Sequence, residues 1–162
     1  MVHSSMGGMH MIAALTAILL GLAVIVLPKG RAPHRLLGLA YAFAMLTTCV
    51  SALLLYSMTG HFGLFHFFAV LCLAYVVIGI TEAIRRRNGW MRRHAVWMGW
   101  SYIGLLAAAA TEAVIRLPVF KHFTGGQTLV LGGGFGVVAT IVGLLMMPRW
   151  TRHALANAQQ GR

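Results

Sequence analysis

Long apolar stretches alternate along the chain with short polar or basic joints. Five apolar stretches occupy residues 11–27, 36–58, 64–84, 95–115 and 128–147. At about 1.5 Å rise per residue, each forms a helix able to cross a hydrocarbon core of about 30 Å with some tilt. The joints contain the prolines, glycines and arginines that end such runs. This pattern predicts an all-α integral membrane protein with five transmembrane helices in a compact bundle.

The composition agrees with this pattern and excludes an ordinary soluble domain. Hydrophobic residues make up 59% of the 162 positions and charged residues only 9%, against about 25% charged residues in soluble domains. We expect one transmembrane domain over residues 1–162, in which residues 148–162 form a short basic cytoplasmic tail. Because no Lys or Arg precedes Lys29, the first stretch lacks the basic region of a signal peptide and is expected to be a retained helix.

Basic residues are concentrated in alternate joints, which predicts the orientation. The first joint, the third joint and the tail carry Lys29, Arg31, Arg35, Arg85, Arg86, Arg87, Arg92, Arg93, Arg149, Arg152 and Arg162. The opposite side has only Arg116 and Lys121. The positive-inside rule then places the N-terminus outside and the C-terminus in the cytoplasm. The net charge of +11 indicates attraction to anionic lipids at the cytoplasmic face, and not binding to nucleic acid.

The histidines and both glutamates fall into one set at each membrane face. The expected outer set is His10, His61, His66, His122 and Glu112, and the inner set is His34, His94 and Glu82, with His153 on the tail within reach. His66 and Glu112 each lie about four residues inside the outer end of a helix, so they are level. Imidazole and carboxylate suit zinc, iron or manganese, and a cation offsets the cost of a carboxylate at membrane depth. The methionines beside His10 would favour copper(I).

Simpler interpretations of the same residues stay open. Glu112 and Glu82 precede Arg116 and Arg86 by four residues, a spacing that favours a helical ion pair. Cys49 and Cys72 are expected to pack as small apolar side chains. The small residues Gly132, Gly136 and Thr140, with Gly143, favour close packing within the bundle or against a partner subunit.

A weak internal repeat suggests a different cofactor. "HRLLGLAY" begins the second helix and "HAVWMGWSY" the fourth, so His34 and His94 are expected at matching depths. With His66 and His122 as a second pair, this arrangement would suit two b-type haems in an electron carrier of the cytochrome b561 type. We expect no polar residues in the middle of the spans to connect the two faces.

Two stretches resemble a known family. "HRLLGLAYAFAMLTTCVSAL" and "RRHAVWMGWSYIGLLAAAATEAVIRL" are similar to small bacterial membrane proteins of the domain-of-unknown-function family 2306, over about residues 34–117. The most specific parts are His34-Arg35 with Gly38, and the run from Arg93 to Tyr102. The resemblance implies a polytopic inner-membrane protein in which His34 and His94 recur, and it implies no activity.

Three classes of function therefore follow from the sequence. The first is a metal-binding membrane protein, whose outer site uses His66 and Glu112 with His10, His61 or His122. The second is a haem-based electron carrier, and the third is a non-enzymatic subunit of a larger complex. The first is preferred because both acids lie beside histidines, and catalysis is neither assigned nor excluded.

Overall fold

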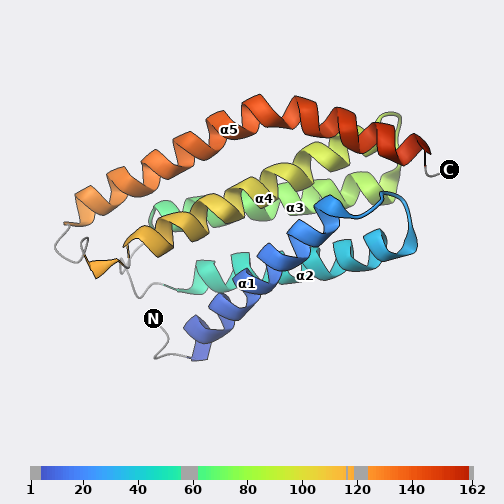
Figure 1. Ribbon diagram of the computed structural model, residues 1–162. Helices are drawn as coiled ribbons and strands as arrows, with labels where there is room; N and C mark the ends of the chain where they lie inside the picture. Colours follow the sequence, from blue (N-terminus) through green and yellow to red (C-terminus); the bar gives the residue numbers. More distant parts are fainter. Residues whose placement is uncertain (1–4, 56–61, 116, 119–123, 161–162) are drawn as a thin grey trace.

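The computed structural model describes residues 5–55, 62–115, 117–118 and 124–160, without the side chains of some of them, such as His153. Within these residues the chain forms five helices that run side by side in alternating directions (Figure 1). They are α1 (Ser5–Val26), α2 (Ala32–Leu54), α3 (Leu64–Arg85), α4 (Trp90–Ile115) and α5 (Gly125–Gln160). The predicted all-helical fold is confirmed.

Helices α1 to α4 form a four-helix unit, and α5 lies outside it. Sequential helices pack on each other, and α1 also contacts α4, which closes the ring. In this ring α2 lies diagonally opposite α4, and α1 lies diagonally opposite α3. Helix α5 covers α4 and makes few contacts with α3 (Figure 1). The main buried cluster accordingly draws on the first four helices, with Ala17, Tyr41, Met45, Cys72, Val76 and Leu105 among its members.

Small residues let the helices of this unit approach closely, as is common in membrane bundles. A Cβ atom on Gly21 of α1 would overlap the ring of Tyr102 on α4, and one on Gly104 of α4 would overlap the sulfur of Cys72. Cys49 and Cys72 are free thiols buried in the core, which confirms the sequence-based prediction that they pack as small apolar residues.

Large apolar side chains cover the outside of the bundle. Leu19, Phe43 and Val130 are each about two-thirds or more exposed, which is the surface expected of a protein solvated by lipid. Among the described residues, four helices are long and apolar enough to span a membrane, namely Ser5–Val26, Ala32–Leu54, Phe65–Arg85 and Gly133–Arg152. Helix α4 is long enough, with 26 residues, but it is not among these four, so the predicted fifth span stays unconfirmed.

Several helices extend beyond the apolar stretches that predicted them. The fifth stretch ends at Met147, whereas α5 continues through Pro148 to Gln160. Helix α1 likewise begins at Ser5 and α4 at Trp90. Hydropathy marks where a helix leaves the apolar layer, and a helix satisfies its own backbone hydrogen bonds on either side of that boundary.

The bundle has two chemically distinct ends. What we call the Glu82 end consists of the last turns of α1, α3 and α5 and the first turns of α2 and α4; the Glu112 end consists of the opposite termini (Figure 1). The α1–α2 and α3–α4 connections, which carry most of the basic residues, both lie at the Glu82 end. Gly30 and Gly89 occupy left-handed backbone conformations in these two turns, with φ of 81° and 74°.

Candidate functional site

At the Glu82 end, the carboxylate of Glu82 is paired with an arginine across the α3–α4 turn. Its Oε2 atom lies 2.8 Å from Nη2 of Arg93. The prediction that Glu82 pairs with Arg86 is therefore wrong. Arg86 has a left-handed backbone conformation at the end of α3, and its guanidinium carbon lies over the ring of Trp90, 5.8 Å from the ring centroid. A sequence spacing of four residues applies within a helix, whereas Arg86 lies just beyond the end of α3.

His94 is fixed at the start of α4 by the backbone of α3. Its Nδ1 atom lies 2.8 Å from the carbonyl oxygen of Gly79. Because a carbonyl only accepts hydrogen bonds, Nδ1 carries the hydrogen, and the lone pair of the neutral ring is on Nε2. Histidines that bind metals are commonly oriented in this way, with the other nitrogen donating to a backbone carbonyl.

His34, at the start of α2, lies close enough to His94 and to Lys29 to interact with both electrostatically. Its Nδ1 atom is buried and makes no hydrogen bond of good geometry among the described residues, although the ring also interacts with the backbone of Val24 on α1. Buried polar atoms without partners are uncommon in native structures and call for an explanation. Of the inner residues predicted to form a site, His34 and His94 thus lie within electrostatic range of each other, and Glu82 pairs with Arg93.

Lys29 caps the C-terminal end of α1 near His34. Its Nζ atom donates to the carbonyl oxygens of Val24 and Ile25, at 2.7 and 2.6 Å. These carbonyls have no intrahelical partner at a helix C-terminus, where a cation is also favourable. Burial lowers the pKa of the Lys29 ammonium from its ordinary value.

A polar layer lies in the middle of the bundle, between the two ends that carry the histidines. The expectation that no polar residues join the two faces stays a prediction. The hydroxyls of Tyr41 on α2 and Ser101 on α4 are 2.8 Å apart, and Ser101 is completely buried. Tyr102 donates to the carbonyl of Ile18 on α1, at 3.2 Å. Tyr41 and Ser101 each follow a predicted histidine by seven residues, two helical turns, which is the signal in the sequence that would have located them.

At the Glu112 end, His10 joins α1 to α2. Its Nδ1 atom lies 2.9 Å from Oγ of Ser51 and 3.2 Å from the carbonyl oxygen of Thr48. Since the carbonyl of Thr48 only accepts, Nδ1 of His10 donates and its Nε2 atom carries the lone pair. Ser51 and Thr48 are buried polar residues of α2 that were not predicted from the sequence.

His66 has the opposite tautomer. Its Nδ1 atom accepts a hydrogen bond of 3.2 Å from the backbone N–H of Gly63, at the start of α3. In the neutral ring the hydrogen is therefore on Nε2. The side chain is only 4% exposed and packs against the ring of Phe62, with ring centroids 5.3 Å apart.

His10, His66 and Glu112 line one pocket of about 140 Å³. The three come from α1, α3 and α4, as the sequence analysis expected for residues level with one another. Among the described residues, however, no group of three or more His, Cys, Asp or Glu side chains is placed to hold a metal ion. Of the other residues predicted for this end, His61, His122 and Arg116 lie outside the described residues.

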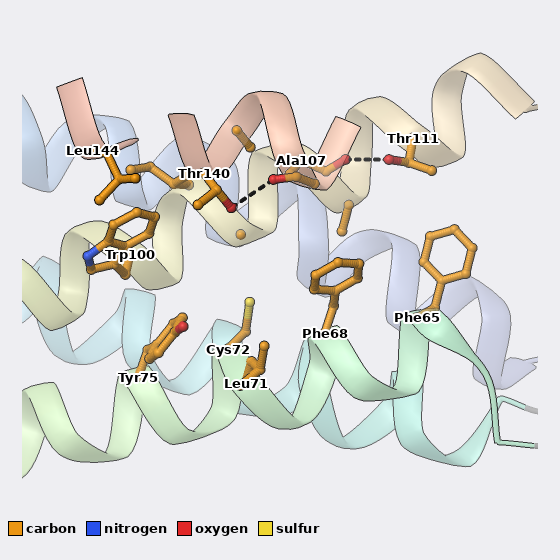
Figure 2. Close-up of a pocket in the computed structure, with 15 residues that line it drawn as sticks. Phe65, Phe68, Leu71, Cys72, Tyr75, Trp100, Ala107, Thr111, Thr140 and Leu144 are labelled. Carbon is orange, nitrogen blue, oxygen red and sulfur yellow. Dashed lines mark hydrogen bonds between the residues drawn. The ribbon is translucent and has the colours of Figure 1, made fainter. Parts of the chain in front are cut away.

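A second, larger cavity of about 300 Å³ lies between α3, α4 and α5 (Figure 2). Aromatic and aliphatic side chains form most of its wall. The hydroxyls of Thr111 and Thr140 are turned to their own helices, where they donate to the carbonyls of Ala107 and Gly136 at 2.8 Å. This cavity shares part of its wall with the first pocket, namely Phe65, Phe68, Cys72, Gly104 and Ala108.

The small residues of α5 pack within the chain. A Cβ atom on Gly136 would lie 3.0 Å from the ring of Phe68, and one on Gly143 would lie 2.7 Å from that of Trp100. Thr140 lines the larger cavity, and the surroundings of Gly132 are outside the described residues. These contacts are those of intramolecular packing, and a role in a homo-oligomer or larger complex stays a prediction.

Comparison with known proteins identifies a family and no close relative. The family model described as "Predicted membrane protein (DUF2306)" matches residues 7–150. No curated protein and no solved structure matches the chain.

Proposed function

The chain belongs to the DUF2306 family of predicted membrane proteins, and from that premise we propose that it binds a transition-metal centre through His34 and His94. The observation that carries this proposal is the buried Nδ1 atom of His34. It makes no hydrogen bond of good geometry among the described residues, and the ring interacts electrostatically with His94 and with the backbone of Val24. A metal ligand needs a lone pair, and each of these imidazoles has one.

The donor set decides which centres fit. Imidazole binds zinc, copper, nickel and iron, including haem iron. Arg93 engages the carboxylate of Glu82, which leaves the two imidazoles as the ligands that we assign. His34 and His94 would be enough to hold a haem iron, whereas a free ion would need water or another donor to complete its coordination. In both cases an imidazole nitrogen of His34 and of His94 would coordinate the metal. A bound haem would also supply one-electron transfer.

The test is the spectrum and metal content of the purified protein. A Soret band would assign haem, and about one equivalent of zinc, copper or iron without such a band would assign an ion. In His94→Ala we expect a loss of about tenfold or more in affinity for the centre. Added imidazole should restore binding, because it replaces the missing ligand. Wild-type protein that contains neither haem nor a metal after expression with both supplied would overturn the proposal.

An ion bound by His66 and Glu112 at the other end stays a prediction. Its support is the common pocket that these residues line with His10. Against it, the hydrogen bond from Gly63 places the hydrogen of His66 on Nε2, so this nitrogen would have to lose its hydrogen before binding a metal. Metal content that is unchanged in His66→Ala and Glu112→Ala would exclude this ion.

We also infer that the protein lies in a bacterial inner membrane with its Glu82 end on the cytoplasmic side. Helix α4 would then be the fifth transmembrane span. The two basic connections lie together at this end, where they would meet anionic lipid. Helix α4 packs between α3 and α5 and also contacts α1, so neighbouring helices would shield its polar residues from lipid. A C-terminal fluorescent fusion that folds only in the cytoplasm should fluoresce, and a dark, full-length fusion would reverse the orientation.

A further inference from the structure

We propose that the cavity between α3, α4 and α5 binds one hydrocarbon chain, namely an acyl chain of a membrane phospholipid. The proposal concerns the acyl chain alone and assigns no contact to the head group. It is independent of the metal centre, because His34 and His94 do not line this cavity. Since the protein belongs to a family of membrane proteins, phospholipid chains surround the outer face of α5.

The cavity arises from the way α5 packs on the four-helix unit. Helix α5 packs mainly on α4 and makes few contacts with α3. Two close contacts hold it in place, Gly136 against the ring of Phe68 on α3 and Gly143 against the ring of Trp100 on α4. Between these contacts α5 presents only short side chains to the cavity, such as that of Ala139. The space between the three helices is therefore not filled by the protein itself.

The chemistry of the wall favours an apolar ligand. No Lys, Arg, His, Asp or Glu is found among the described residues that line the cavity. The hydroxyls of Thr111 and Thr140 already donate to carbonyls of their own helices, at 2.8 Å (Figure 2). The rest of the wall is mainly aromatic and aliphatic, with Tyr75 and Trp100 at one end. A charged ligand would lose its hydration here without compensation, whereas a hydrocarbon chain would not.

The dimensions of the cavity fit a single chain. Its wall on α3 runs from Phe65 to Tyr75, which is about 15 Å of helix at about 1.5 Å rise per residue. A volume of about 300 Å³ spread over this length leaves a mean cross-section of about 20 Å². This is room for one extended hydrocarbon chain, and a sterol or another fused-ring lipid is wider. An engineered apolar cavity of about 150 Å³ stays dry and binds benzene, so water is not the expected occupant.

The cavity has a route to the lipid. Leu144 in its wall is 62% exposed, and Thr140 is also exposed. Both residues lie in Gly133–Arg152, the part of α5 that is apolar enough to span a membrane. An acyl chain can therefore enter from the side, within the apolar layer, without opening the four-helix unit. Once bound, it would lie between α5 and α3, where the protein makes few contacts of its own.

Trp100 in the cavity wall provides the measurement, because bromine quenches tryptophan fluorescence on contact. The probe is a long-chain phosphatidylcholine with brominated acyl chains, added to the protein in detergent micelles. We expect saturable quenching, and we expect the saturable part to disappear in Trp100→Phe. Unlabelled phosphatidylcholine with hexanoyl chains should compete at least about tenfold less well than the long-chain lipid, because it leaves much of the cavity empty. Long-chain phosphatidylglycerol should compete as well as long-chain phosphatidylcholine.

Two neighbouring positions of α5 locate the ligand. Ala139→Phe places a ring inside the cavity and should weaken binding at least about tenfold. Val138→Phe is the matched control, because Val138 is 58% exposed and does not line the cavity, and it should bind like wild type. If Ala139→Phe fails to fold, the competition by the hexanoyl lipid decides alone. Non-saturable quenching, equal competition by the hexanoyl lipid, an affinity that follows the head group, or wild-type affinity in folded Ala139→Phe would each overturn the proposal.

Discussion

The two ends of the bundle use histidine in different ways. At the Glu82 end, His34 and His94 lie within electrostatic range of each other, and the carboxylate of Glu82 pairs with Arg93. At the Glu112 end, His10 and His66 line a pocket together with the carboxylate and have opposite tautomers. The first arrangement presents two lone pairs, and the second presents a donor and an acceptor. Similar residues therefore offer different hydrogen-bonding and ligating atoms at the two ends.

The polar layer of Tyr41, Ser101 and Tyr102 lies between the two ends. Disrupting the packing around it is expected to have the largest effect on the free energy of unfolding. In Gly21→Leu the new side chain would overlap the ring of Tyr102, where even a Cβ atom has no room. We expect a loss of about 3 kcal/mol in the free energy of unfolding from this overpacking, measured by SDS titration. Gly38→Leu is the matched control, because no atom lies within 4 Å of a Cβ at Gly38. Equal losses in both variants would show that α1 does not pack as described.

The Glu112 end depends on the hydrogen bonds of His10. His10→Ala removes the contacts to Ser51 and to the carbonyl of Thr48, and we expect a loss of about 1.5 kcal/mol in the free energy of unfolding. The content of any metal should stay at the wild-type level, since His10 lies at the end opposite to His34. A metal-free His10→Ala protein that is otherwise folded would contradict the separation of the two ends.

The link across the middle is the Tyr41–Ser101 hydrogen bond. Tyr41→Phe removes one hydroxyl from this buried pair, and we expect a loss of about 1 kcal/mol. A double-mutant cycle with Ser101→Ala isolates the interaction between the two residues. Additive effects in the cycle would mean that the two hydroxyls do not interact.

The smallest effect concerns pH at the Glu82 end. Burial lowers the pKa of Lys29 in the folded protein below its ordinary value of 10.5. Between these two pKa values the unfolded state binds more protons, so the stability contributed by Lys29 rises with pH and is complete above 10.5. The free energy of unfolding, measured as a function of pH up to about pH 11, should therefore rise less steeply in Lys29→Met than in wild type. Parallel profiles would show that Lys29 titrates as an exposed lysine.

The sequence predicted the helices well because apolar length is a property of each segment alone. All five stretches became helices, and His66 and Glu112, which were expected to be level with each other, line one pocket. The depth of a residue follows from counting turns along its own helix. The limits of the helices were less predictable, since α5 continues for several turns beyond its apolar part.

The contacts between helices could not be predicted in the same way. Whether Glu82 pairs with Arg86 or Arg93 depends on the backbone turn at Arg86, and the sequence spacing alone favoured the wrong residue. The tautomers of His10 and His66 depend on partners 41 and 3 residues away. The polar layer at Tyr41 and Ser101 was missed because each residue, considered alone, looks like an ordinary member of an apolar helix.

The most direct test of the account is the metal and haem content of two double variants. We predict that His34→Ala/His94→Ala contains neither, while His10→Ala/His66→Ala contains as much as wild type. The reverse result, with the centre lost only from His10→Ala/His66→Ala, would contradict the assignment of the metal to the Glu82 end.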